Sequence, residues 1–347
     1  MTDQPGAHRK LIALAQGYQT AALLLAYAEL GIADQLAASP RTLLELARAV
    51  GADAGALARL LTAAEALGLV AWDGETWRNT AWASETLVSS APRPLIHFLQ
   101  HQQAFYRRWS RLAEAVRAGR RPEENRSDEN APDWVRRFTL MLYDLARLQA
   151  DQVADALAPL LDGLPHPPRI LDVGGGHGEY AMALARRLPK AEAVVFDLPP
   201  VISITAELIA QARLEHRVRV AAGDFHRDSL GSGYDLALLF GVLVSENDPS
   251  ALRLLATVRQ ALAPGGWIAI TVLVPGDADT RLRVALRDLH MLLSTDHGRV
   301  PDVATVEAWL LASGFVDVQR LPIGDDSVNQ LIVARRPPRW SEAEPTS

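Results

Sequence analysis

Residues 170–178 read Ile-Leu-Asp-Val-Gly-Gly-Gly-His-Gly, an apolar strand that leads into a glycine-rich turn. A helical pattern follows at once, over Glu179–Leu188, so the turn ends at the N-terminus of a helix. Glycines at this point let the backbone approach a ligand, and a helix N-terminus attracts a negatively charged group. The stretch therefore predicts a strand–loop–helix unit that binds a ligand with an anionic part.

Two common kinds of nucleotide-binding loop do not fit this stretch. A dinucleotide fingerprint needs G-x-G-x-x-G, but counting from Gly174 and Gly176 places Glu179 at the third position. A P-loop needs G-K-S/T, which is absent. The strand instead ends in Asp172. This pattern suits a zwitterionic amino-acid group, whose carboxylate meets the loop amides while Asp172 binds its ammonium.

The next two predicted strands also end in groups that suit one ligand. Asp197, in Phe196-Asp-Leu-Pro199, stands about 20 residues beyond the glycines, where an acid can accept ribose hydroxyls. Asp224, in Gly223-Asp-Phe225, can accept from an adenine amino group, and Phe225 can cover the ring. Each has another interpretation: Asp172 as a turn acid, Asp197 as a helix cap, Phe225 as core. Their order and spacing favour a shared cofactor site.

The second half of the chain alternates strands and helices. Continuous apolar strands in such an alternation predict a parallel sheet covered by helices on both faces. The last two strands are close in sequence and predict a final antiparallel pair. A helix over Ser250–Ala263 is expected to be capped by Asp248-Pro249. The seven predicted strands are Arg169–Val173, Ala193–Asp197, Arg217–Ala221, Tyr234–Phe240, Trp267–Val274, Phe315–Leu321 and Val328–Ala334.

The first 94 residues predict a mostly helical winged helix. Apolar residues recur at helical spacing from Leu11 to Leu36. Thr42 and Asp53 each open a shorter helix, and a two-stranded hairpin follows around Asp73-Gly74. We expect four regions: a winged-helix domain over 1–94, a helical linker over 95–161, the sheet domain over 162–337 and a flexible tail over 338–347.

The amino-acid composition of the chain excludes several classes of function. The 347-residue chain has a net charge of −6 and no cysteine, which excludes disulfides, thiolate metal sites and a cysteine nucleophile. No metal-binding cluster is evident. The polar N-terminus and the absence of an apolar run of membrane-spanning length predict a soluble, cytoplasmic protein. Residues 1–95 hold seven basic against nine acidic residues, so nucleic acid is not an expected partner.

These motifs resemble the caffeic-acid-type O-methyltransferase family, in its bacterial branch. The resemblance runs from about Leu11 to Ala334 and includes Asp172-Val-Gly-Gly-Gly176, Phe196-Asp-Leu-Pro199, Gly223-Asp224, Ala263-Pro-Gly-Gly266, Gly298-Arg299 and Gly314-Phe315. It implies a Rossmann-like class I methyltransferase domain of α/β type, preceded by a winged-helix dimerisation domain. It also implies S-adenosylmethionine as cofactor, S-adenosylhomocysteine as product, a homodimer and a small aromatic substrate. By this resemblance Gly174, Asp197, Leu198, Asp224 and Phe225 contact the cofactor.

The chain departs from that family at the catalytic base. The family has a histidine where Val244 stands here, followed by Ser245 and Glu246. A glutamate of a later loop is missing too, because His297-Gly-Arg-Val300 occupies its place. Valine accepts no proton, so base-assisted methylation of a phenol is not expected.

Two residues are candidates to replace the base. Glu246 lies two residues beyond Val244, and His290 lies on a helix that lines the substrate pocket in the family. A solvated loop acid and a structural hydrogen bond are the respective alternatives. The predicted substrate pocket contains Met141, Tyr143, Val244, His290 and Met291, although core or dimer contacts also fit the first two.

Two functions remain open from the sequence. The first is methylation of an aromatic or polycyclic metabolite at nitrogen, carbon or an acidic oxygen, none of which needs a strong base. The second is a repurposed relative that binds S-adenosylmethionine but performs hydroxylation, decarboxylation or rearrangement. A DNA-binding regulator is disfavoured, because the helix over Ala54–Leu67 carries only Arg59 as a basic residue.

Overall fold

The computed structural model describes residues 4–123, 132–324 and 326–338. The chain divides into two compact units, one up to Tyr106 and one from Arg107 onward. The boundary between them falls inside helix α6 (Ile96–Trp109), so the helical segment after residue 95 contributes to both units. The predicted tail at 338–347, residue 338 excepted, lies outside the described residues.

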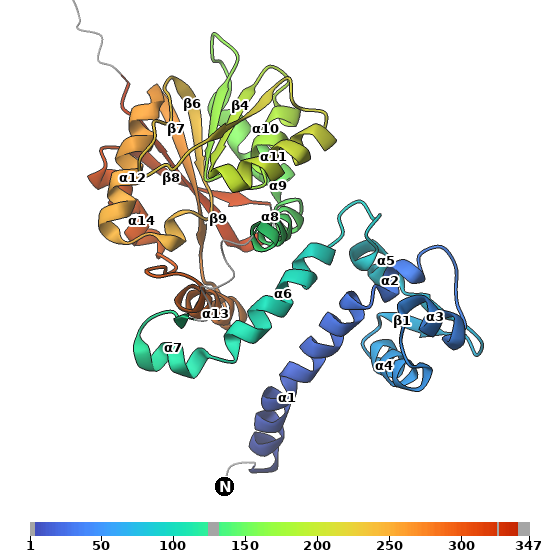
Figure 1. The fold of residues 1–347 in the computed structure, drawn as a ribbon. Coiled ribbons are helices and arrows are strands. Elements are labelled where there is room, and N and C mark those ends of the chain that lie inside the picture. The colour runs from blue at the N-terminus through green and yellow to red at the C-terminus, as the bar shows by residue number, and fades with distance from the viewer. Residues whose placement is uncertain (1–3, 124–131, 325, 339–347) are drawn as a thin grey trace, which may run out of the picture. The chain divides into compact units, whose positions relative to one another are not determined.

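The first unit is a helical domain with one small hairpin (Figure 1). The capping residues are the ones that the sequence predicted: Thr42 forms a capping box with Glu45, and Asp53 accepts a hydrogen bond from the Ala56 amide at 2.8 Å. The antiparallel hairpin completes the predicted winged helix. The elements are α1 (Gln4–Glu29), α2 (Ile32–Gln35), α3 (Leu43–Val50), α4 (Ala54–Ala66), β1 (Val70–Trp72), β2 (Trp77–Asn79) and α5 (Ala81–Leu87).

Helix α1 differs from the prediction in two ways. The helical pattern of Leu11–Leu36 is interrupted, because Gly31 takes a positive φ of 63° between α1 and α2. Between Gly6 and Glu29 the helix is also long and apolar enough to cross a membrane, by length and composition alone. Several of its large apolar side chains are exposed, among them Leu11 at 67% and Leu14 at 72%.

The second unit contains the predicted seven-stranded sheet, in the order β5-β4-β3-β6-β7-β9-β8. Adjacent strands are parallel from β5 to β7, and β9 is antiparallel to both of its neighbours, as expected from the sequence. The strands are β3 (Arg169–Val173), β4 (Glu192–Asp197), β5 (Val218–Ala222), β6 (Tyr234–Leu239), β7 (Leu262–Leu273), β8 (Val316–Ile323) and β9 (Asp326–Arg335).

Helices cover both faces of this sheet, as Figure 1 shows. One face packs against α9 (Ala150–Leu157), α10 (Glu179–Arg187) and α11 (Pro199–Gln211). The other packs against α12 (Asp248–Ala261) and α14 (Val303–Ala312). The remaining helices are α7 (Leu112–Ala118), α8 (Pro132–Ala146) and α13 (Ala278–Ser294), with short 3₁₀ turns at Ala158–Leu161 and Leu243–Ser245.

The cap of α12 corrects one prediction. Asn247, not Asp248, is the N-cap: its Oδ1 accepts from the Ser250 amide at 3.1 Å, and the Ser250 hydroxyl accepts from the Asn247 amide. Asp248 is the first residue inside the helix.

Strand β3 lies between β4 and β6. The strands that follow β3 in the chain therefore lie first on one side of it and then on the other. Ligands of open α/β sheets bind at such a reversal, outside the carboxyl ends of the strands. The glycine loop follows β3 and therefore lies at this point.

Candidate cofactor and active site

The glycine loop is tightly turned and leaves one side open. Gly174, Gly176 and Gly178 have positive φ angles of 63°, 54° and 71°, which side chains other than glycine rarely adopt. A Cβ atom on Gly175 would lie 2.5 Å from Cγ of Asp172, whereas a Cβ atom on Gly176 would meet nothing within 4 Å. The loop thus packs closely around Asp172 and offers free space at Gly176.

Asp172 is a buried carboxylate that calls for a cationic partner. Its side chain is 1% exposed, and neither carboxylate oxygen has a hydrogen-bond partner of normal geometry among the described residues. Burial and, to a smaller extent, the nearby Asp197 carboxylate raise the pKa of Asp172 to about 7, and the Ala181 amide offsets this only in part. Because an unpaired buried carboxylate is costly, the residue fits the ammonium group of an amino-acid ligand.

Asp197 connects the end of β4 to the glycine loop. Its Oδ2 accepts from the Gly176 amide at 2.8 Å and its Oδ1 from the Leu198 amide at 2.7 Å. Burial raises the pKa of Asp197, and the same two amides partly counteract this. Each oxygen keeps a lone pair for a further donor, such as a ribose hydroxyl. Leu198 is 49% exposed beside it.

The end of β5 also lies beside the glycine loop. The Phe225 ring borders the glycine loop, since a Cβ atom on Gly174 would lie 3.6 Å from its Cε1. Asp224 is half-buried, and its Oδ1 accepts from the His226 amide at 2.9 Å. The structure therefore brings together the three strand ends that the sequence singled out.

Val244 lies in the 3₁₀ turn after β6, half-buried and without any proton-accepting side chain. The loop between α13 and α14 packs on this turn: a Cβ atom on Gly298 would lie 2.5 Å from the Val244 carbonyl oxygen. The residue at this position is thus apolar, and its backbone carbonyl lies against the loop between α13 and α14.

Glu246 is 9% exposed and is not a solvated loop acid. Its Oε1 lies 3.2 Å from Nε2 of His226, so the two side chains join the loop after β5 to the loop after β6. The sequence did not predict this pair, because the two residues meet only in the folded sheet.

His290 is buried on α13, and its Nε2 lies 3.3 Å from the Ser294 hydroxyl one turn later. Its ring stacks on Trp109 with 6.4 Å between centroids. Met291 beside it is 5% exposed. This is the structural hydrogen bond of the alternative interpretation.

Helix α8 presents Met141 and Tyr143 in different environments. Two residues along a helix differ by about 200°, which places them on opposite sides. Tyr143 lies near the glycine loop, with its ring 6.1 Å from that of His177, and Met141 is 3% exposed elsewhere. His177 accepts from the Glu179 amide through Nδ1 at 3.0 Å, and burial lowers its pKa to about 4, so this ring is neutral at pH 7.

Arg147 is a candidate that sequence reasoning missed. Its guanidinium lies 4.7 Å from the centre of the Tyr143 ring and bonds Asp144 at 3.2 Å. The i, i+4 spacing from Tyr143 is the signal that relates it to the glycine loop. A positive charge here suits a ligand carboxylate.

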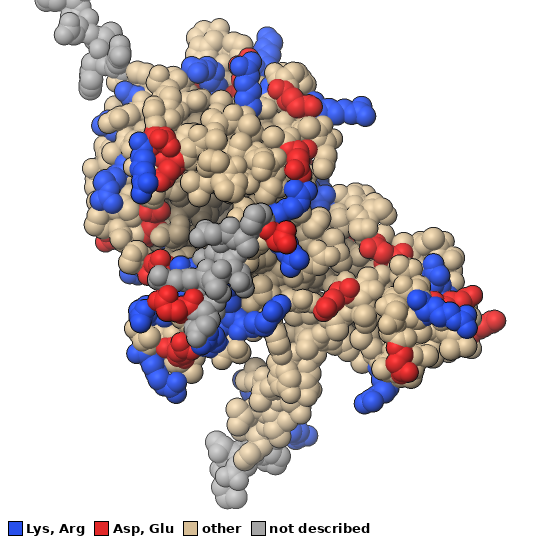
Figure 2. Space-filling view, in the orientation of Figure 1, with Lys and Arg blue, Asp and Glu red and all other residues tan. Residues whose placement is uncertain are grey.

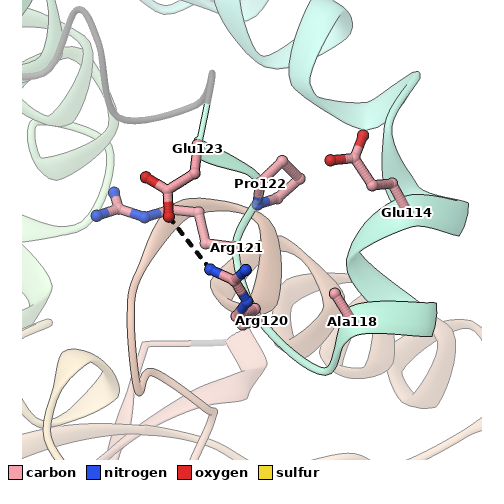
Figure 3. Close-up of a pocket in the computed structure, with 6 residues that line it drawn as sticks. All are labelled: Glu114, Ala118, Arg120, Arg121, Pro122 and Glu123. Atoms are coloured by element: carbon pink, nitrogen blue, oxygen red, sulfur yellow. Dashed lines mark hydrogen bonds and ion pairs between the residues drawn. The ribbon is translucent and has the colours of Figure 1, made fainter.

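A separate pocket of about 240 Å³ borders α7 and the turn after it (Figure 3). It is lined by Glu114, Ala118, Arg120, Arg121, Pro122 and Glu123, none of which belongs to the strand-end site. Arg120 and Glu123 bond each other at 3.2 Å at its edge. We assign this pocket no function. Within the described ranges no group of three histidine, aspartate or glutamate side chains is placed to hold a metal ion.

Comparison with known proteins identifies the family. Residues 109–316 match an O-methyltransferase domain, and residues 12–89 match an O-methyltransferase dimerisation domain. The 3-hydroxy-5-methyl-1-naphthoate 3-O-methyltransferase of Streptomyces sahachiroi is 32% identical over 92% of both chains. The N,N-dimethyltransferase OxyT of Streptomyces rimosus is 30% identical over 95% of this chain and 96% of its own.

A solved structure supports the same family assignment. Human N-acetylserotonin methyltransferase, in complex with S-adenosylmethionine, superposes with a TM-score of 0.85 at 28% identity, covering 97% of this chain and 99% of its own. The chain therefore belongs to the O-methyltransferase family and is an S-adenosylmethionine-dependent methyltransferase.

Proposed function

We propose that this protein transfers the methyl group of S-adenosylmethionine to a small aromatic metabolite, at a nitrogen, an electron-rich carbon or an acidic hydroxyl. The observation that supports the cofactor site most directly is Asp172. Its buried carboxylate lacks a partner of normal geometry and stands beside a loop with free space at Gly176.

The other cofactor contacts follow from the positions of the strand ends. Asp197 accepts the ribose hydroxyls, Asp224 the adenine amino group, and Leu198 and Phe225 cover the base. The charge of Arg147 attracts the ligand carboxylate, since the Gly174 and Gly176 amides already donate to Phe196 and Asp197. When bound, the cofactor supplies an electrophilic methyl group on a positively charged sulfur.

The identity of Val244 supports the choice of acceptor atom. Methyl transfer requires an in-line nucleophile about 3–3.5 Å from the methyl carbon, and positioning alone provides much of the rate. A neutral amine, a carbon nucleophile or an ionised hydroxyl reacts without a base at this point. The two relatives named above carry names that specify O- and N-methylation, which agrees with such a range.

Glu246 and His290 have distinct proposed roles. Glu246 is held by His226, which suits it to fixing the two loops rather than to abstracting a proton. His290 is proposed to line the substrate pocket together with Met141, Met291 and Val244, whereas Tyr143, on the opposite side of α8, lies beside the glycine loop.

We also propose that the protein is a homodimer that uses α1. Its exposed apolar side chains, such as Leu11, Ile12 and Leu14, lie in or beside the segment that matches the dimerisation domain. Covering them with a second copy removes apolar area from water and accounts for the hydropathy of α1 without a membrane. A soluble cytoplasmic enzyme, without a nucleic-acid partner, is the proposed context.

The test uses S-adenosylmethionine that carries an isotopic label on the methyl group. The full-length protein is incubated with aromatic amines, hydroxyaryl acids and phenols, and products are analysed by mass spectrometry. Label in the aromatic product supports methyl transfer. A product that forms only with the cofactor but lacks the label supports the repurposed enzyme instead.

A further inference from the structure

A buried acid links two turns of the second unit, the β5 turn (residues 223–228) and the β6 turn (residues 242–246). Most charged side chains of this unit lie at its surface, where acidic and basic groups are interspersed (Figure 2). Glu246 is buried instead, and its Oε1 lies 3.2 Å from Nε2 of His226. A carboxylate only accepts hydrogen bonds, so the imidazole donates to it. Because a buried carboxylate without a donor is costly, the folded protein favours this contact.

The two turns meet across the proposed cofactor site. His226 follows β5 and Glu246 follows β6, yet β4 and β3 lie between these strands in the sheet. Neighbouring strands are about 4.8 Å apart, so the ends of β5 and β6 are about 14 Å apart. The His226–Glu246 bond therefore bridges the strand ends that carry Asp197 and the glycine loop.

The same turns also converge at Gly174. A Cβ atom on Gly174 would lie 2.7 Å from Cγ2 of Val242 and 3.6 Å from Cε1 of Phe225. One of these side chains belongs to the β6 turn and the other to the β5 turn. The turns are thus related at two places, and close packing at one of them limits independent movement.

Hydrogen bonds within each turn allow it to move as a unit. In the β5 turn the His226 amide donates to Oδ1 of Asp224 at 2.9 Å, and the Asp224 amide donates to Asp228 at 2.8 Å. In the β6 turn the Glu246 amide donates to the Leu243 carbonyl at 3.2 Å. A change in the position of Asp224 is therefore passed to His226, and through Glu246 to the β6 turn.

We propose that His226 and Glu246 are positioning residues that couple the cofactor to the acceptor side of the site. The proposal rests on the cofactor contacts proposed above for Asp224 and Phe225. These two residues become fixed when they hold the adenine group, and the His226–Glu246 bond then fixes the β6 turn that carries Val244. The acceptor therefore meets an ordered turn only after the cofactor is bound. Such positioning matters most in a site without a base at Val244.

The test measures hydrogen–deuterium exchange in the full-length protein, with and without saturating S-adenosylhomocysteine. The reporters are the Ser245 and Glu246 amides, whose bonds to the Val242 and Leu243 carbonyls break when the β6 turn opens. We expect the ligand to slow their exchange at least about fivefold, the low end of the usual coupling between two sites. His226→Leu and Glu246→Leu should abolish this effect, while the ligand still protects the β5 turn.

Further variants distinguish loss of this one bond from general damage. Glu246→Gln can still accept from His226 and should keep part of the protection. The double variant His226→Leu/Glu246→Leu should lose no more than either single variant, as expected for two residues that act through one contact. His216→Gln is the matched control, because His216 is an exposed histidine just before β5, at the opposite end of that strand. It should behave as the native protein.

Two results would overturn the coupling: unchanged exchange of the β6 turn in native protein that has bound the ligand, or retained protection in both leucine variants. If Glu246→Leu fails to fold, His226→Leu gives the same answer, because the His226 side chain is 39% exposed. Calorimetric titration of the same samples separates the coupling from the proposed function. A native protein that does not bind S-adenosylhomocysteine contradicts the cofactor site and the coupling with it, whereas binding without protection of the β6 turn contradicts only the coupling.

Discussion

At the scale of single residues, Asp172 combines a structural cost with a proposed functional use. A carboxylate buried to 1% exposure beside Asp197 has its pKa raised to about 7. The cofactor ammonium requires the ionised form, so binding lowers this pKa and releases a proton. A site of this kind is destabilising until its ligand arrives.

The affinity for S-adenosylmethionine should therefore rise with pH. Below the pKa of about 7 the Asp172 carboxyl is protonated and has to lose its proton on binding. Titration calorimetry at pH 6 and pH 8 should show about a tenfold difference, as expected for one unit below that pKa. Asp172→Asn should bind weakly at both pH values. Equal affinities of the native protein at pH 6 and pH 8 would contradict this role.

Asp172→Asn should also stabilise the protein without its cofactor. The pKa of Asp172 is raised in the folded state, so its contribution to stability falls as pH rises from the unfolded value of about 4 to the folded value of about 7. The neutral amide avoids that cost. Thermal unfolding should show a gain of about 1–3 kcal/mol at pH 8 and a smaller gain at pH 5. A destabilised variant at pH 8 would refute the account of the buried charge.

At the scale of secondary-structure elements, the loop between α13 and α14 defines the surroundings of Val244. Gly298 has an ordinary backbone conformation, yet an added Cβ atom would collide with the Val244 carbonyl oxygen and the Thr295 hydroxyl. The loop therefore requires glycine for close contact, not for a special dihedral angle.

Gly298→Ala should consequently displace this loop and impair turnover more than cofactor binding. We expect a fall in kcat of at least about tenfold, because small displacements of reacting groups are costly. The affinity for S-adenosylhomocysteine should change little. Gly276→Ala is the control, since its Cβ atom would make only an ordinary 3.5 Å contact with the Thr280 hydroxyl. Equal kinetics of the two variants would argue against packing of the loop on Val244.

Most of the secondary-structure elements could be predicted from the sequence. The seven strands, the glycine loop and the caps at Thr42 and Asp53 follow from local patterns, because each depends on periodicity or on a nearby hydrogen bond. The N-cap of α12 was misplaced by one residue, since Asn247 and Asp248 are both good caps and only geometry separates them.

Only part of the candidate site could be predicted from the sequence. The strand ends could be predicted to converge, because carboxyl ends of parallel strands share one edge. The pairing of Glu246 with His226, the contact of Gly298 with Val244 and the opposite environments of Met141 and Tyr143 depend on tertiary packing. No spacing along the chain encodes these contacts.

At the scale of the whole molecule, the exposed face of α1 predicts association. Leu14 is 72% exposed on this helix. Leu14→Glu should convert a dimer into a monomer, because a charge in an apolar interface is not solvated. Light scattering after size-exclusion chromatography measures the mass directly. Leu311→Glu, at a 60% exposed site on α14, is the control and should stay dimeric. A monomeric native protein would contradict the proposed use of α1.

The most direct test of the whole account is calorimetric titration of S-adenosylmethionine and S-adenosylhomocysteine into the native protein and into Asp197→Ala. Asp197 ties the end of β4 to Gly176 and is the proposed acceptor for the ribose. We expect both ligands to bind the native protein, and the variant to lose about 1.5–3 kcal/mol for each, as for charge-assisted hydrogen bonds. Binding of neither ligand by the native protein, or equal binding by the variant, would contradict the assignment of the strand-end site to the cofactor.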